Sequence, residues 1–100
     1  MKSIKENTEL FNVTAYCSCK DCSEQYGTKT STGTTAIEGR TIAVDPTVIP
    51  YGTKVLIKGN VYTAEDCGSL IKGKDIDIYF ESHKDVEAFG RKKLEVIYEH

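Results

Sequence analysis

The sequence predicts a small, mainly β barrel formed by one domain, and three observations support this fold class. The chain has 100 residues, which is the length of a single domain. About six short runs are rich in β-branched and aromatic residues, and turn signals separate them. Only one segment has the pattern of a short helix, whereas a parallel βαβ sheet needs helices between its strands.

The expected strands either alternate apolar and polar residues or consist of a short apolar run, as buried strands do. They cover residues 11–16, 41–44, 54–58, 61–64, 75–80 and 94–98. Gly59-Asn60 is expected to form the hairpin turn between the third and fourth strands. Ser82, with an acidic residue three positions later, predicts the start of the helix, and Gly90 predicts its end.

Charge and hydropathy exclude several classes of partner. Lys and Arg total 13 and Asp and Glu total 15, so the chain has no basic excess for nucleic acid. It also has no apolar run long enough to span a membrane or to act as a signal peptide. We therefore expect a monomer that binds no nucleic acid, does not insert into membranes, and is either a mature fragment or a protein released without its own signal. Residues 1–10 are polar and are expected to be a flexible leader before the barrel of residues 11–100.

Four cysteines leave three alternatives open. Cys17, Cys19 and Cys22 lie together in a long polar loop, and Cys67 is distant in sequence. They are compatible with two disulfides, with free thiols, or with a zinc ion held by thiolates. One disulfide alternative has Cys17 or Cys22 tying this loop to the barrel near Cys67. The paired C-x-x-C motifs typical of zinc sites are absent.

Three aspartates lie at or near the ends of expected strands. Asp45 follows A-V, Asp66 follows A-E, and Asp77 lies inside D-I-D-I-Y-F. If these strand ends converge, repulsion between like charges raises the pKa of at least one carboxyl. A carboxyl that stays protonated near neutral pH is suited to general acid catalysis on a glycosidic oxygen. The same residues also fit ordinary turn and surface positions.

Several motifs in the same order give the chain a specific resemblance. They are A-V-D-P-T-V-I-P-Y-G-T (43–53), A-E-D-C-G-S-L-I-K-G (64–73) and D-I-D-I-Y-F (75–80), with T-A-Y at 14–16, T-A at 35–36 and F-G-R at 89–91. Over residues 11–99 the chain resembles the three-aspartate (3D) domain family, related to lytic murein transglycosylase A and to stationary-phase survival muralytic proteins. The resemblance implies a six-stranded double-psi β-barrel that carries one short helix and the long cysteine-containing loop.

The resemblance also implies an activity. Family members cleave peptidoglycan between N-acetylmuramic acid and N-acetylglucosamine and release 1,6-anhydro-muramyl products, so they are lyases that act on the cell wall. On this reading Asp66 is the acid/base, and Asp45 and Asp77 hold it and raise its pKa. No cofactor is required. The chain departs from the family at Cys67, where Thr is frequent, and in the cysteine-rich loop.

Five further residues are expected to contact the glycan. Thr14, Tyr16 and Thr35 match family positions near the cleft, and Gly68 is expected to allow close backbone approach after the acid. Lys72 is expected either to pair with an aspartate or to contact sugar. Two alternatives to catalysis remain: a glycan-binding module like the expansins, and a metal- or redox-controlled protein built on the cysteines.

Overall fold

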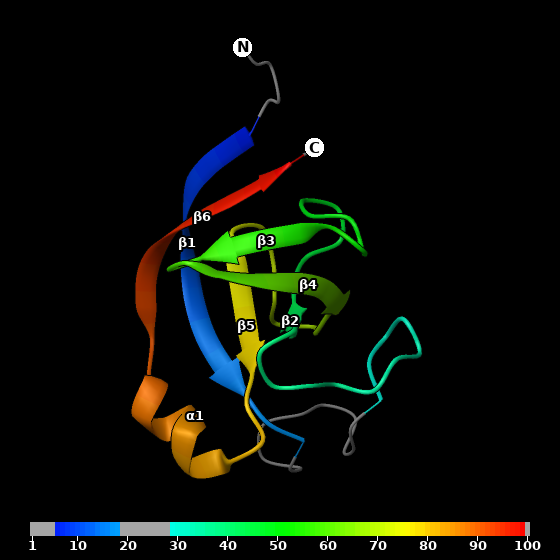
Figure 1. The fold of residues 1–100 in the computed structure, drawn as a ribbon, viewed down its shortest axis with the longest axis vertical. Helices are drawn as coiled ribbons and strands as arrows, with labels where there is room; N and C mark the ends of the chain where they lie inside the picture. The colour runs from blue at the N-terminus through cyan, green and yellow to red at the C-terminus, as the bar shows by residue number, and fades with distance from the viewer. Residues whose placement is uncertain (1–5, 19–28, 100) are drawn as a thin grey trace.

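The structure, a computed structural model, describes residues 6–18 and 29–99. Within these residues six strands close into a barrel with one helix at its side (Figure 1). The predicted fold class, a small double-psi β-barrel with one short helix, is confirmed. The elements in chain order are β1 Glu6–Tyr16, β2 Thr41–Ala43, β3 Lys54–Ile57, β4 Asn60–Asp66, β5 Asp75–Tyr79, α1 His83–Phe89 and β6 Lys92–Glu99.

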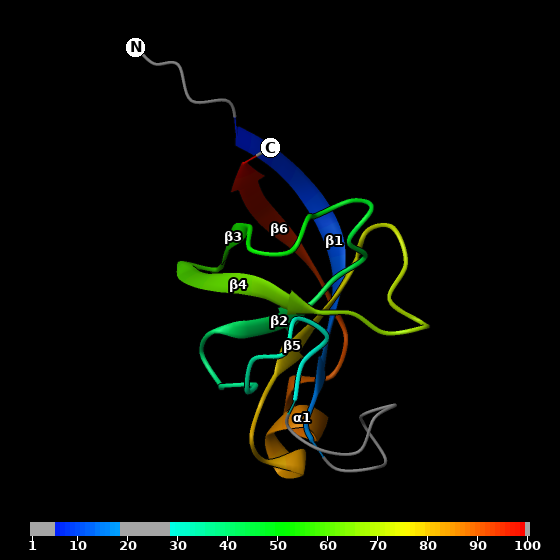
Figure 2. The ribbon, with the colours of Figure 1, turned by 90° about the vertical axis from the view of Figure 1, so that its right-hand side faces the viewer.

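The topology places β2 between two longer strands. The barrel order is β1-β5-β2-β4-β3-β6, and β1 with β5 and β2 with β4 run parallel. Figure 2 shows β4, β2 and β5 following one another across the barrel. Ala43 of β2 is therefore paired with Asp66 on one side and with Asp77 on the other. Two of the three predicted aspartates thus flank one short strand.

β1 is longer than the sequence indicated. It begins at Glu6, and its antiparallel pairing with β6 runs from Glu6 opposite Glu99 to Val13 opposite Lys92. Residues 6–10 are therefore sheet, so the predicted leader over residues 1–10 is wrong for its second half; residues 1–5 lie outside the described part. Leu10 is 56% exposed opposite Glu95, while the next β6 residues also pair with β3 and close the barrel (Figure 1). Residues 6–9 are all polar, so this part of the strand shows no apolar alternation in the sequence.

The hairpin turn also differs by one residue from the prediction. It is formed by Lys58 and Gly59, while Asn60 already pairs with Ile57. Both turn residues have positive φ, 51° and 81°. A two-residue turn with positive φ at both positions matches the right-handed twist of the strands it joins, which explains the shift.

The core has two parts. The larger is a cluster of buried, mostly β-branched residues from all six strands, among them Phe11, Val13, Ile42, Val55, Ala64, Ile76 and Val96. The smaller consists of Tyr16, Ala36, Ala43 and Tyr79, with Ile71 packed against it. Tyr16 and Tyr79 meet edge to face with ring centroids 5.4 Å apart, a favourable aromatic geometry. This smaller cluster includes Ala43, the β2 residue that pairs with both Asp66 and Asp77.

The helix begins and ends as predicted. The Ser82 side chain accepts a hydrogen bond from Lys84 N at 3.2 Å, and Gly90, with φ 71°, donates its N–H to Val86 O. Phe89 packs against Phe80, with ring centroids 5.8 Å apart, and this contact holds the helix against the barrel. No helix within residues 6–18 and 29–99 is long and apolar enough to cross a membrane.

Candidate active site

The Asp66 carboxylate lies at the end of β4, where four hydrogen-bond donors surround it. Its Oδ1 accepts hydrogen bonds from Ser31 N at 3.0 Å, Ser31 Oγ at 2.8 Å and Cys67 N at 2.9 Å. Its Oδ2 accepts one from the Tyr16 hydroxyl at 3.1 Å. Donors from the end of β1, from a loop and from its own turn therefore fix the carboxylate in one orientation.

A β-bulge orients the Asp66 side chain toward these donors. Ile42 pairs with Ala64 and Ala43 pairs with Asp66, so Glu65 has no partner on β2. A bulge of this kind turns the side chains that follow it and is frequent beside active sites. Glu65 itself is buried, where it accepts a hydrogen bond from Thr41 Oγ1 at 2.8 Å. Its carboxylate also forms an ion pair with Arg40 at 3.2 Å, which satisfies the buried charge.

The loop that carries Ser31 is stiffened by threonine hydroxyls. Thr30 is buried, and its Oγ1 lies 2.7 Å from Thr34 Oγ1 and 3.1 Å from Thr32 Oγ1. Thr32 N donates to Glu65 O at 3.2 Å, which joins the loop to the bulge. The sequence analysis missed Ser31; the only available signal was the run Thr-Ser-Thr-Gly-Thr, whose glycine adopts φ 90°.

Asp77 is the carboxyl whose proton affinity is raised. Burial, followed by the charge of Asp75, raises its pKa from 3.8 to about 6, and Arg91 opposes this shift. Thr14, its neighbour on β1, donates a hydrogen bond to its Oδ1. We expected mutual repulsion among three aspartates to raise a pKa; the dominant cause here is burial.

Asp45 behaves in the opposite way. Its carboxylate accepts hydrogen bonds from Gly73 N at 2.8 Å and from Thr47 N and Oγ1 at 3.0 and 2.7 Å. These bonds lower its pKa from 3.8 to about 2, and the charge of Lys72 adds a smaller effect. In the described residues no hydrogen bond joins Asp45 or Asp77 to Asp66. That Asp45 and Asp77 hold Asp66 in place stays a prediction; the hydrogen bonds of Asp45 secure the turn after β2 to the segment before β5.

Tyr16 contributes its hydroxyl rather than its ring. Its side chain is buried in the smaller cluster, so the faces of its ring are covered. Burial raises its pKa, and the charges of Asp66 and Asp77 raise it further, which places the phenol close to both carboxylates. The hydroxyl therefore stays protonated at any ordinary pH and remains a donor to Asp66.

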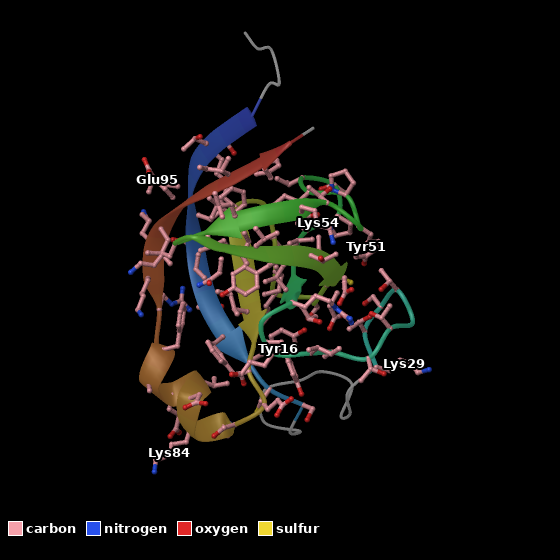
Figure 3. The ribbon with its side chains drawn as sticks, in the orientation of Figure 1. Tyr16, Lys29, Tyr51, Lys54, Lys84 and Glu95 are labelled. Atoms are coloured by element: carbon pink, nitrogen blue, oxygen red, sulfur yellow. The ribbon has the colours of Figure 1, made fainter. Side chains whose placement is uncertain are left out.

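Tyr51 and Cys67 complete the exposed edge of the site. Tyr51 is 41% exposed, and its hydrogen bond with Cys67 is the largest cause of its raised pKa. Cys67 is an exposed free thiol with Sγ 3.3 Å from Ser31 Oγ. Figure 3 labels Tyr51 near the end of β4, and Tyr16 lower on the barrel. Tyr51 was not predicted, yet it is an exposed aromatic ring beside Asp66.

The remaining predicted residues have no direct bond to Asp66. Thr35 is exposed, and its carbonyl accepts Arg40 Nη2 at 2.8 Å. The Gly68 carbonyl accepts Ile71 N at 3.1 Å in the turn after the site. Lys72 is exposed and its backbone N lies 3.4 Å from Asp75 Oδ2. Their contact with a glycan stays a prediction.

The cysteines lie in different surroundings. Cys17 is buried, with Sγ 3.6 Å from His83 Nδ1 of α1, whereas Cys67 contacts Ser31 and Tyr51. Cys67 is a free thiol, so the disulfide between Cys17 and Cys67 is not formed. Cys19 and Cys22 lie outside the described residues. Among the residues that are described, no group of three His, Cys, Asp or Glu is placed to hold a metal ion.

The fold and the site define a class of protein: a closed six-stranded barrel in which hydrogen-bond donors surround an aspartate at the end of β4, beside β2. The chain belongs to the 3D domain family, which it matches over residues 40–98, from the start of β2 nearly to the end of β6. Two relatives come from Bacillus subtilis (strain 168). The putative cell wall shaping protein YabE is 39% identical over 85 residues, covering 83% of this chain and 21% of YabE. The cell wall-binding protein YocH is 45% identical over 58 residues, 57% of this chain and 20% of YocH.

Solved structures share the fold. MltA from E. coli superposes with a TM-score of 0.62 at 21% identity, covering 77% of this chain and 28% of MltA. The lytic transglycosylase LtgG of Burkholderia pseudomallei gives 0.55 at 23% identity, with 74% and 27% covered. The chain therefore spans between a fifth and about three tenths of the proteins it resembles.

Replacing Ser31 with Ala should weaken the function of Asp66 without unfolding the barrel. The backbone N–H of residue 31 remains, but the Oγ hydrogen bond to a charged oxygen, worth roughly 1.5–3 kcal/mol, is lost. We expect about a 10- to 100-fold lower rate in an assay of glycan cleavage. Thr32→Ala is the matched control, because its hydroxyl contacts threonines of the loop and not Asp66. Equal effects of the two substitutions would contradict a specific role of Ser31.

Proposed function

We propose that the chain is a peptidoglycan lytic transglycosylase that cleaves the β-1,4 bond between N-acetylmuramic acid and N-acetylglucosamine, with Asp66 as its acid/base. The observation that carries the proposal is one carboxylate held by four hydrogen bonds at the end of β4. The barrel around it resembles those of MltA and LtgG, and relatives of the chain are named for shaping or binding the cell wall.

The proposed reaction needs only one carboxyl group. Protonated Asp66 donates its proton to the bridging oxygen as the bond from that oxygen to C1 of the muramic residue breaks. The C6 hydroxyl of the same residue then bonds to C1 and gives its proton to the Asp66 carboxylate. The products are a 1,6-anhydro-muramyl end and a free C4 hydroxyl. An intramolecular nucleophile is already positioned, so no second carboxyl is required to activate water.

The surrounding residues would support both halves of this cycle. The donors on Oδ1 and Oδ2 keep the orientation of the Asp66 carboxyl fixed. Tyr51 offers an exposed ring at the edge where a sugar would lie. Asp77 would contribute negative charge near the oxocarbenium ion that forms as the bond breaks.

A second candidate is a glycan-binding module without catalysis. The name of YocH, a cell wall-binding protein, favours it, and the exposed Tyr51 beside a polar loop is also compatible with sugar binding. Under this candidate the hydrogen bonds around Asp66 hold a sugar-binding carboxylate, and no bond is broken.

Incubation with purified insoluble peptidoglycan distinguishes these functions. We expect soluble fragments that mass spectrometry identifies as 1,6-anhydro-muropeptides, 18 Da lighter than hydrolysis products because no water is added. Fragments with reducing ends would show a hydrolase and overturn the lyase mechanism. Co-sedimentation with peptidoglycan without soluble fragments would support the binding module instead. A longer protein that contains this domain would be expected to act at the cell wall.

A further inference from the structure

We propose that Tyr51 is the residue on which an N-acetylglucosamine ring of the bound glycan stacks, and that the Cys67 thiol holds the Tyr51 ring in position. The choice of this sugar rests on the proposed function, whereas sugar binding by Tyr51 does not. We did not expect Tyr51 at the glycan from the sequence. The structure places it against Cys67, the residue that directly follows Asp66.

The Tyr51 ring is an aromatic surface that is open to solvent. The residue is 41% exposed, and within residues 6–18 and 29–99 no other aromatic residue is exposed; Tyr16, for example, is 7% exposed. An N-acetylglucosamine ring in its chair form has its large substituents equatorial, so its axial C–H groups form two apolar faces. These weakly positive C–H groups pack well on the negative face of an aromatic ring. An exposed ring beside a candidate acid is therefore suited to hold a sugar.

Side-chain hydrogen bonds link the Tyr51 ring to the Asp66 carboxylate. The Tyr51 hydroxyl bonds to the side chains of Cys67 and Ser31, and Cys67 Sγ lies 3.3 Å from Ser31 Oγ. The same Ser31 hydroxyl donates to Asp66 Oδ1 at 2.8 Å. A tyrosine has an apolar body and a polar tip, so it can be anchored by its hydroxyl and still present its ring. Cys67 and Ser31 therefore fix the hydroxyl end of the ring relative to the carboxylate.

The backbone around Tyr51 is fixed to the strand that carries Asp66. Gly52 N donates to Ala64 O at 2.8 Å, and Ala64 N donates to Thr53 O at 3.0 Å. Ala64 lies on β4 within the buried core, two positions before Asp66. A residue that is held both at its backbone and at the end of its side chain loses little freedom when a ligand binds. This preorganisation favours binding.

The chemistry of the proposed reaction indicates which sugar lies on Tyr51. The muramic ring changes shape, because O6 reaches C1 only when the C6 group turns axial and the other substituents follow it. Its C–H faces are then no longer flat. The N-acetylglucosamine residue on the other side of the bridging oxygen gains only a proton at O4 and keeps its chair. A fixed aromatic ring fits the sugar whose shape stays constant and holds the bond beside the acid, so we assign Tyr51 to this residue.

Calorimetry with a β-1,4-linked trimer of N-acetylglucosamine tests the binding. This probe lacks the muramic residue, so its affinity does not depend on the proposed cleavage. Tyr51→Ala should raise the Kd by about 10- to 30-fold, as the loss of a central aromatic contact does. Tyr51→Phe keeps the ring and loses the hydroxyl bond, and it should raise the Kd by about 2- to 5-fold. Val61→Ala is the matched control, because Val61 is 59% exposed at the other end of β4 and should leave the Kd unchanged.

A double variant tests the role of Cys67. Cys67→Ala should raise the Kd for the trimer by about 2- to 5-fold. Combining it with Tyr51→Phe should weaken binding no further, because both substitutions remove the same hydrogen bond. Additive effects, or wild-type affinity of the Cys67→Ala protein, would overturn the positioning role of the thiol. Circular dichroism of each variant separates lost binding from lost folding.

Nuclear Overhauser contacts identify the sugar that lies on Tyr51. In the Asp66→Asn protein with a tetrasaccharide of alternating N-acetylglucosamine and N-acetylmuramic acid, the Tyr51 ring protons should contact axial hydrogens of N-acetylglucosamine. Contacts to the muramic rings alone would overturn the choice of sugar.

The results also separate this proposal from the proposed function. Tyr51-dependent binding of the trimer by a protein that releases no anhydro products would refute the lyase and support stacking on Tyr51. Cleavage of peptidoglycan by a folded Tyr51→Ala protein at the wild-type KM would refute the stacking and leave the lyase standing. Failure of the wild type to bind the trimer would overturn the stacking as well.

Discussion

Asp66→Asn is expected to eliminate nearly all release of 1,6-anhydro-muropeptides, with a rate about 10²- to 10⁴-fold below that of the wild type. The amide has the size of the carboxyl but donates no proton to a leaving oxygen. Its own oxygen still accepts the Ser31 hydrogen bonds, and its NH₂ group faces the Tyr16 hydroxyl, which can accept. The fold and the shape of the site should therefore survive while the chemistry is lost.

The rate is measured by quantifying soluble anhydro products over time. Binding of the variant to insoluble peptidoglycan is measured in parallel, and we expect it to persist. Asp85→Asn is the matched control, because Asp85 is exposed in the first turn of α1 and should leave the rate unchanged. Release by the Asp66→Asn protein at the wild-type rate would refute Asp66 as the acid/base and would direct attention to Asp77.

Local patterns in the sequence were sufficient for most of the fold. Alternation in β5 and the short apolar run in β2 reflect burial, and the Ser82 and Gly90 caps bound α1 because they satisfy backbone groups at its ends. The pattern failed at residues 6–10, where β1 pairs with β6 although residues 6–9 are all polar. Backbone pairing alone leaves no periodic signal in the residue types.

The candidate site was only partly predictable, for a different reason. The motifs marked the aspartates, but their chemistry depends on tertiary contacts. Asp77 is buried beside Thr14, whereas Asp45 meets the Gly73 backbone N–H in an exposed turn. Ser31 reaches Asp66 across 35 positions of the chain, through a loop whose residue types are those of any polar loop. The spacing of residues in the sequence does not predict contacts between residues so far apart in the chain.

Asp77→Asn is expected to stabilise the barrel at neutral and alkaline pH. The pKa of Asp77 is about 6 in the folded protein against an ordinary 3.8, because its charged form is buried near Asp75. The folded state therefore binds the proton more tightly than the unfolded state between these values. The favourable contribution of this carboxyl is complete below about pH 4 and is lost as the pH rises through 6.

The size of the effect follows from the shift. About two pKa units correspond to roughly 3 kcal/mol, so the Asn variant should be more stable than the wild type by ~2–3 kcal/mol at pH 8 and by about nothing at pH 4. The Asn oxygen can still accept the Thr14 hydrogen bond. Urea unfolding at pH 4, 6 and 8 measures this difference, and a difference that is constant over this range would contradict it. A gain in stability together with slower glycan cleavage is expected if the charge of Asp77 is needed for function although it destabilises the fold.

Asp45→Asn provides the comparison of opposite sign in the same barrel. The pKa of Asp45 is lowered to about 2 by hydrogen bonds from Gly73 and Thr47, so its ionised form stabilises the folded state above pH 4 and this contribution is lost as the pH falls towards 2. The Asn variant should therefore be less stable than the wild type at pH 8, where the Asp77→Asn protein is more stable. Opposite pH dependences of stability for the two variants would show that the Asp45 carboxylate stabilises the fold by securing the turn after β2. They would also show that burial makes the charge of Asp77 destabilising. If both variants responded to pH in the same direction, burial and hydrogen bonding would not be what separates these two residues.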